Sequence, residues 1–236
     1  SVDLMYGGTG SGSVDTSKAP NFKQALEDQG IQVNSTLWDL YSSDDMMKNY
    51  SRITPAAISD TLEANTQYAV NEAPWSKLSS AESSFADYGD AAIVVFSRSG
   101  GEGADLSYGE VNYLALDENE KAMLQNVAEM KKNGIVKKTI VLINSANALQ
   151  VDFLKNNEYD IDAALWIGDV GISGINAVAE ILTGKVNPSG KLAETWANAY
   201  EETPARDNFA GAGRTVQYRE GLYVGYRYYQ TAGVPV

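Results

Sequence analysis

The sequence predicts one three-layer α/β domain built around a parallel sheet. Short apolar runs rich in β-branched residues alternate with segments of helical periodicity, the order expected when covering helices join parallel strands. The chain has 236 residues, 44% of them hydrophobic, enough for a single domain of this class. The predicted strands are Val2–Met5, Ile31–Val33, Ala91–Phe96, Thr139–Asn144 and Ala163–Ile167.

The clearest predicted helix spans Asp117–Asn133. Asp117 and Glu120 form a capping box, apolar residues recur every three or four positions, and Gly134 marks the end. The segments before Ile31–Val33 predict a βαβ unit with a right-handed crossover. Further helices are predicted at Phe22–Gln29, Leu37–Tyr50, Ile58–Val70, Ser79–Tyr88, Val151–Asn156 and Ile172–Leu182.

Composition excludes several kinds of chemistry. With no Cys and no His, the chain has no disulfide, no thiolate nucleophile and no imidazole metal ligand, so we expect no metal site and no cofactor. A formal net charge of -13 argues against binding nucleic acid or an anionic membrane surface. Acid–base work must fall to carboxylates, Tyr or Lys, and neutral ligands such as sugars are compatible with the charge.

A glycine-rich stretch with one acid follows the predicted strand Ala91–Phe96. Glu102 is flanked by glycines, including Gly101, whose backbone can approach a ligand closely. Ligands of α/β sheets bind where loops leave the carboxyl ends of strands. Taken alone, the stretch is also explained as a solvated surface turn.

Carboxylate catalysis is the natural candidate for a chain without His or Cys. Glycoside hydrolysis uses two carboxyl groups across the scissile bond, and Glu102 is the candidate proton donor. The spacing does not single out the second carboxylate, and Asp105, Glu110 and Glu220 all remain open.

The glycines of Gly7–Ser13 favour a tight turn over a nucleotide site. A P-loop would end in Gly-Lys-Ser/Thr, and no Lys follows these glycines. In a dinucleotide-binding turn the third glycine position would hold Gly where this chain has Ser13, and the helix would begin at once.

Three separated stretches together resemble the α/β-sandwich domain of glycoside hydrolase family 3, the partner of a barrel domain in β-glucosidases. They are Ser97–Asp105, Trp166–Lys191 and Tyr218–Tyr229. The resemblance implies a six-stranded, mostly parallel sheet and a retaining β-glycosidase that hydrolyses terminal β-linked sugars of β-glucosides or oligosaccharides. By the same resemblance Glu102 is the general acid/base, and Gly101, Asp105 and Tyr218 contact substrate.

The resemblance also implies that residues 1–236 form one domain of a longer enzyme. The nucleophilic Asp belongs to the barrel, which we expect after Val236, so the domain alone should be inactive. The face that meets the barrel should be apolar and Tyr-rich. Two positions depart from the family, which usually has Arg at Leu106 and Pro at Ala193. They support the alternative of a non-catalytic carbohydrate-binding or interaction module of the same fold.

Overall fold

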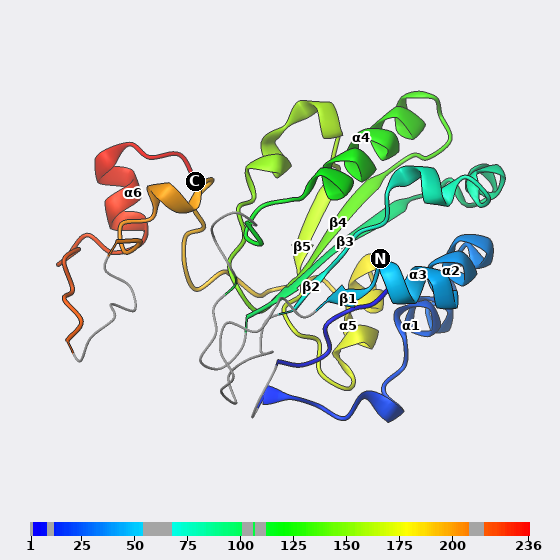
Figure 1. The fold of residues 1–236 in the computed structure, drawn as a ribbon, viewed down its shortest axis with the longest axis horizontal. Coiled ribbons are helices and arrows are strands. Elements are labelled where there is room, and N and C mark those ends of the chain that lie inside the picture. Colours follow the sequence, from blue (N-terminus) through cyan, green and yellow to red (C-terminus); the bar gives the residue numbers. More distant parts are fainter. Residues whose placement is uncertain (1, 9–11, 54–67, 101–105, 107–111, 208–214) are drawn as a thin grey trace.

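The computed structural model describes residues 2–8, 12–53, 68–100, 106, 112–207 and 215–236. Within them the chain forms one sheet with the strand order β1-β2-β3-β4-β5 (Figure 1). β3, β4 and β5 are parallel, whereas β1 and β2 add to the sheet in antiparallel fashion. The strands are β1 (Arg52–Ile53), β2 (Tyr68–Val70), β3 (Ala92–Ser99), β4 (Thr139–Ser145) and β5 (Ala163–Trp166).

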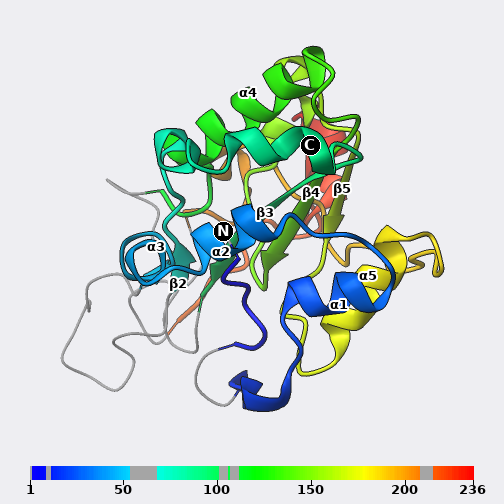
Figure 2. The ribbon, with the colours of Figure 1, turned by 90° about the vertical axis from the view of Figure 1, so that its right-hand side faces the viewer.

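Helices cover both faces of the parallel strands, so the domain has three layers. Helix α4 lies on one face and helices α1 and α5 lie on the other (Figure 2). The α-helices are α1 (Phe22–Asp28), α2 (Ser35–Tyr41), α3 (Asp44–Asn49), α4 (Glu118–Lys132), α5 (Gly174–Leu182) and α6 (Tyr226–Ala232). Short 3-10 helices span Thr16–Lys18, Trp75–Leu78, Glu82–Tyr88, Asp152–Lys155, Asn157–Tyr159 and Tyr200–Glu202.

The alternation of side chains along β3 and β4 divides the core into two clusters. Val94 and Phe96 of β3 pack with α4 residues such as Leu124. Val95 points to the opposite face and packs with Leu142 of β4 and with residues of α1 and α5. Because both faces are covered, these strands are continuous apolar runs, as parallel strands require.

Helix α4 confirms the most specific local prediction. The Asp117 side chain accepts a hydrogen bond from the Glu120 backbone N–H, and the Glu120 carboxylate accepts one from the Asp117 N–H, both at 2.8 Å. Gly134 has a φ of +72°, so a residue without Cβ suits the end of this helix. The helix runs antiparallel to the strands and joins the carboxyl end of β3 to the amino end of β4 (Figure 1).

The expected six-stranded, mostly parallel sheet is not what the described residues form. They contain five strands, of which three are parallel. Val2–Met5 is not a strand, because the Met5 backbone N–H and C=O pair with the side chain of Asn144 instead of a neighbouring strand. Ile31–Val33 is also not a strand, and the Ile31 N–H still bonds the end of α1 at Leu26 O. The predicted βαβ unit therefore does not form.

The predicted surface helix Ile58–Val70 is wrong at its end. Tyr68–Val70 is β2, and the aromatic and β-branched residues there suit a strand better than a helix. The remainder of that prediction, 58–67, lies outside the described residues. The predicted helix Ser79–Tyr88 is a shorter 3-10 helix, Glu82–Tyr88.

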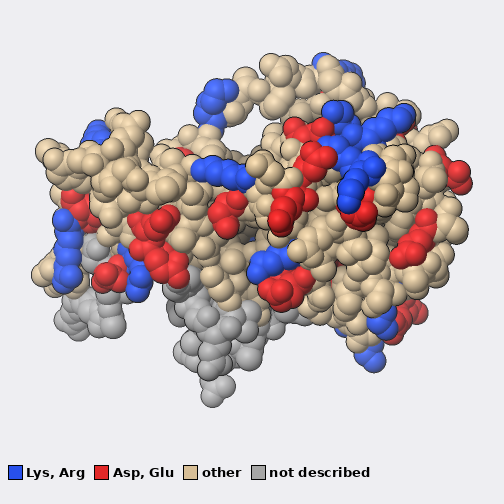
Figure 3. All heavy atoms as spheres, turned by 90° about the horizontal axis from the view of Figure 1, so that it is seen from above, with Lys and Arg blue, Asp and Glu red and all other residues tan. Residues whose placement is uncertain are grey.

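The surface mixes charges of both signs. Acidic and basic side chains intermingle in the view from above, with a dense group of both signs over the end of α4 (Figure 3). In the part of the chain that the structure describes, no helix combines the length and the apolar character needed to cross a membrane.

Candidate functional site

The three parallel strands end together at one edge of the sheet. Phe96 of β3 lies beside Ile143 of β4, which in turn lies beside Trp166 of β5. Beyond this row the strands change from apolar to polar residues, such as Ser97 and Asn144. In open α/β folds ligands bind outside the carboxyl ends of the strands, so this edge is the candidate site.

Asn144 joins three segments at this edge. Its fully buried side chain accepts a hydrogen bond from Ser97 Oγ at 2.9 Å. Its Nδ2 donates to Met5 O at 2.9 Å and to Gly168 O at 2.7 Å. One amide therefore holds the end of β3, the N-terminal segment and the loop after β5 together.

The first residue after β3 is fixed to the loop that follows β4. The Gly100 N–H donates to Asn147 Oδ1 at 2.6 Å. Asn147 is itself held by Ser145, whose Oγ donates to Asn147 O and accepts from Asn147 N–H. Gly100, two residues before Glu102 in the sequence, is thus fixed at the carboxyl edge.

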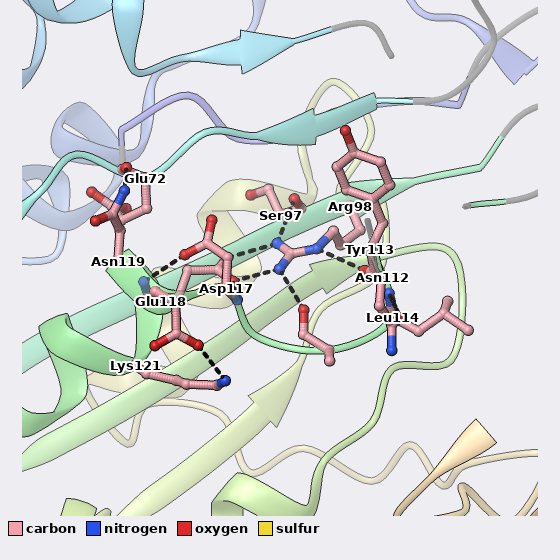
Figure 4. A network of polar contacts seen from close by, with 12 residues as sticks. Glu72, Ser97, Arg98, Asn112, Tyr113, Leu114, Asp117, Glu118, Asn119 and Lys121 are labelled. Carbon is pink, nitrogen blue, oxygen red and sulfur yellow. Dashed lines mark hydrogen bonds and ion pairs between the residues drawn. The ribbon is translucent and has the colours of Figure 1, made fainter. Parts of the chain in front are cut away.

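A buried ion pair links the end of β3 to the start of α4 (Figure 4). The Arg98 guanidinium donates to both carboxylate oxygens of Glu120, Nη1 to Oε1 at 2.7 Å and Nη2 to Oε2 at 2.5 Å. The two side chains are only 3% and 2% exposed. Arg98 also donates from Nε to Tyr113 O at 2.9 Å and from Nη2 to Ala115 O at 3.2 Å.

Burial and charge act in opposite directions on Glu120. Burial raises the pKa of the Glu120 carboxyl, while the adjacent Arg98 guanidinium counteracts that rise. The same carboxylate closes the capping box of α4. Glu120 therefore serves the helix start and the ion pair at once.

A cavity of about 460 Å³ lies beside Asn147, between the segment that contains Trp196 and the C-terminal segment with α6. Trp196 is buried and packs edge-to-face against Trp166 at the end of β5, with ring centroids 5.7 Å apart. The cavity is lined by aromatic, apolar and charged side chains, among them Leu106, Leu114, Trp196, Tyr200, Arg206, Glu220 and Tyr229. An aromatic wall with a few polar groups is typical of sites for small neutral ligands.

The structure describes only some of the sequence-predicted site residues. Gly101, Glu102, Asp105 and the alternative carboxylate Glu110 lie outside the described residues. Glu220, the other alternative carboxylate, lines the cavity beside Asn147.

Tyr218, predicted to contact substrate, is 87% exposed and does not line that cavity. Its carbonyl accepts a hydrogen bond from the nearby Gly221 N–H. It belongs to a set of large exposed apolar or aromatic side chains, which comprises Val216, Tyr218, Leu222, Tyr223, Val224 and Tyr226. We call this set the tyrosine-rich patch.

Sequence reasoning missed Arg98 and Asn147. A clue to Arg98 was available, because an Arg at the end of a buried apolar strand needs a partner acid. Asn147 sits in an ordinary loop sequence and carries no such clue. Among the described residues no group of three or more acidic side chains is placed to hold a metal ion.

The fold and this edge define a class of protein. It is an α/β domain whose parallel strands are covered on both faces and whose polar groups gather at the strand ends. A sequence model described as the glycosyl hydrolase family 3 C-terminal domain matches residues 3–226. The chain belongs to this family.

Individual relatives agree with the family assignment. A β-glucosidase of Ruminococcus albus is 29% identical over 233 residues, which cover 98% of this chain and 22% of the relative. Thermostable β-glucosidase B of Acetivibrio thermocellus is 36% identical over 122 residues, 52% of this chain and 15% of the relative. The matched part of the chain thus covers about a fifth or less of the length of each of these two relatives.

A solved structure shows the same fold. The crystal structure of a β-glucosidase from Paenibacillus barengoltzii matches with a TM-score of 0.76 and 29% sequence identity. The match covers 95% of this chain and 23% of the other.

Proposed function

We propose that this chain is the domain of a retaining β-glycosidase that supplies Glu102 as general acid and then as general base. The substrate class is a terminal β-linked glucoside or oligosaccharide, as the names of the β-glucosidase relatives suggest. The nucleophile comes from a barrel domain of the same polypeptide, so the domain alone does not hydrolyse glycosides. Gly101, Asp105 and Tyr218 contact the substrate.

The observation that carries the proposal is the anchoring of Gly100 and Leu106, the described residues on either side of Glu102 in the sequence. Gly100 is tied to Asn147 at the carboxyl edge, and residue 102 follows it by two residues, a reach of about 7 Å. On the other side, Leu106 is 6% exposed and packs in the cluster beneath α4. Ligands of such folds bind near the strand ends, so the position of these two anchors supports a role for Glu102 at that edge.

The tyrosine-rich patch is the surface we assign to the barrel. It exposes aromatic and apolar side chains that a monomeric surface rarely gathers in one segment. Contact with the barrel would cover them and bring Tyr218 toward the substrate.

The test is the Glu102→Gln variant of the full-length parent enzyme. Loss of the acid/base should lower kcat/KM on an unactivated β-glucoside by about 100- to 10,000-fold, because the leaving group then departs without a proton. The matched control is Glu158→Gln, which removes an exposed carboxylate on a short 3-10 helix and should change nothing. Near wild-type hydrolysis by Glu102→Gln would refute the assignment.

A non-catalytic carbohydrate-binding module is the alternative, and one observation favours it. Leu106, where the family usually has Arg, points into the apolar core and cannot contact a ligand through a charged group. Under this alternative the parent protein binds β-linked oligosaccharides with Glu102 intact or replaced, and hydrolyses none of them.

A further inference from the structure

We propose that Arg98 is a positioning residue that, through Glu120, sets where the acid/base group sits relative to the sheet. The inference rests on the proposed function of Glu102. Arg98 is the penultimate residue of β3, and Glu120 lies in the first turn of α4. The ion pair therefore joins the two ends of the segment that connects β3 to α4.

Arg98 also binds the chain just before helix α4. Its Nε and Nη2 donate to Tyr113 O and Ala115 O, while its own strand is held in register beside Ser145 of β4. The Gln150 N–H donates to Leu114 O at 2.7 Å, so the returning chain is also tied to the loop after β4. Gly100 and the chain from Tyr113 to Ala115 are thus held by β3 and by the loop that follows β4.

Stability alone does not require this arrangement. Removing two charges from water costs several kcal/mol per ion, and apolar residues of similar volume often replace a buried pair without loss. What apolar residues cannot reproduce is the planar fork of donors that binds a carboxylate and two carbonyls in one geometry. The Arg98–Glu120 pair is thus suited to fixing geometry.

The consequence concerns the proton that the leaving group receives. A general acid must lie within hydrogen-bond reach of the glycosidic oxygen, and a displacement of about 1 Å can cost 100-fold in rate. Substrates whose leaving groups depart unprotonated do not depend on that placement. A misplaced acid is therefore recognised by a loss of kcat/KM that is confined to substrates with poor leaving groups.

The experiment uses the full-length enzyme and the double variant Arg98→Met/Glu120→Met, with kcat/KM measured on methyl β-glucoside and 2,4-dinitrophenyl β-glucoside. We expect about a 100-fold loss on the methyl glucoside and little change on the dinitrophenyl glucoside, with cooperative thermal unfolding retained. The matched control is Lys131→Met/Asp162→Leu, which removes an ion pair at the opposite end of α4 and should leave both values unchanged. Arg98→Lys keeps the positive charge but lacks the planar guanidinium group. It should lower kcat/KM by a smaller factor, again only on the methyl glucoside, and it replaces the double variant if that variant does not fold.

Two results would overturn the inference. One is wild-type kcat/KM on both substrates, and the other is an equal loss on both, which indicates general support of the fold. Glu102→Gln is assayed in parallel on the same substrates. If it lacks the leaving-group selectivity, the proposed function fails as well; if it shows the selectivity and the Arg98 variants do not, only the positioning role fails.

Discussion

The two ends of helix α4 carry ion pairs of opposite character. At its start, Arg98 and Glu120 are almost fully buried and share a bidentate contact. At its end, Lys131 and Lys138 both bind Asp162 at the surface, at 2.6 and 2.8 Å. The start lies at the carboxyl edge of the sheet, and the end lies at the amino edge. The same helix is therefore held by a buried, bidentate ion pair where we place function and by more exposed ion pairs at its other end.

The largest expected effect comes from breaking the buried pair on one side only. Arg98→Met leaves the Glu120 carboxylate buried beside no cation, and we expect the free energy of unfolding to fall by about 3–5 kcal/mol. Adding Glu120→Met should recover most of that loss. Urea unfolding of the single and double variants measures both values, and a double variant no more stable than the single one would contradict the argument.

A smaller effect is expected from the caps of α4. Asp117→Ala removes the acceptor for the Glu120 N–H and should cost about 1 kcal/mol. Asn133→Ala at the other end should stay within about 0.5 kcal/mol, since Asn133 is a surface residue there. Thermal unfolding of the two variants compares them directly, and equal losses would show that the two ends are held alike.

The smallest effect is expected at the surface cluster, and it depends on pH. Hydrogen bonds from Lys131 and Lys138 and from the Thr139 N–H hold the pKa of Asp162 well below its ordinary value. Because the folded-state pKa is the lower one, the stabilisation is present above the unfolded-state pKa of about 4 and disappears as the pH falls through the folded-state value.

The variant Asp162→Asn tests the direction of this pH dependence. At neutral pH it should lower stability by about 1 kcal/mol or less, and high salt should reduce the difference. Urea midpoints measured from neutral pH downward should begin to converge with those of the unchanged chain below about pH 4, and should meet as the pH approaches the lower folded-state pKa of Asp162. A gap that widens on acidification would mean that the cluster does not stabilise the fold through this carboxylate.

The sequence predicted what depends on neighbouring residues. The capping box of Asp117 and Glu120 needs residues three apart, and the core strands β3 and β4 are continuous apolar runs. The Arg98–Glu120 pair joins residues far apart in the chain and depends on how α4 packs on the sheet. Likewise, no local pattern reveals that the Asn144 side chain hydrogen-bonds the backbone N–H and C=O of Met5. Because of these bonds the expected strand Val2–Met5 does not form.

The sequence likewise predicts only part of the candidate site. The glycine-rich stretch and the general rule for parallel sheets predict a site at the end of β3, and that stays a prediction. They do not predict the cavity beside Asn147, because it forms only when segments distant in the sequence, around Trp196 and Tyr229, come together. Whether Tyr218 contacts substrate stays a prediction.

The contact of Trp166 with Trp196 provides an optical reporter. Two indole rings 5.7 Å apart and steeply inclined couple their electronic transitions, and such a pair produces a paired positive and negative band in ultraviolet circular dichroism. Trp166 belongs to the sheet, whereas Trp196 belongs to the segment that walls the cavity. The band pair would therefore vanish if that segment left the sheet, even while the helices remained intact, and the closing and opening of the cavity wall could be followed without any label.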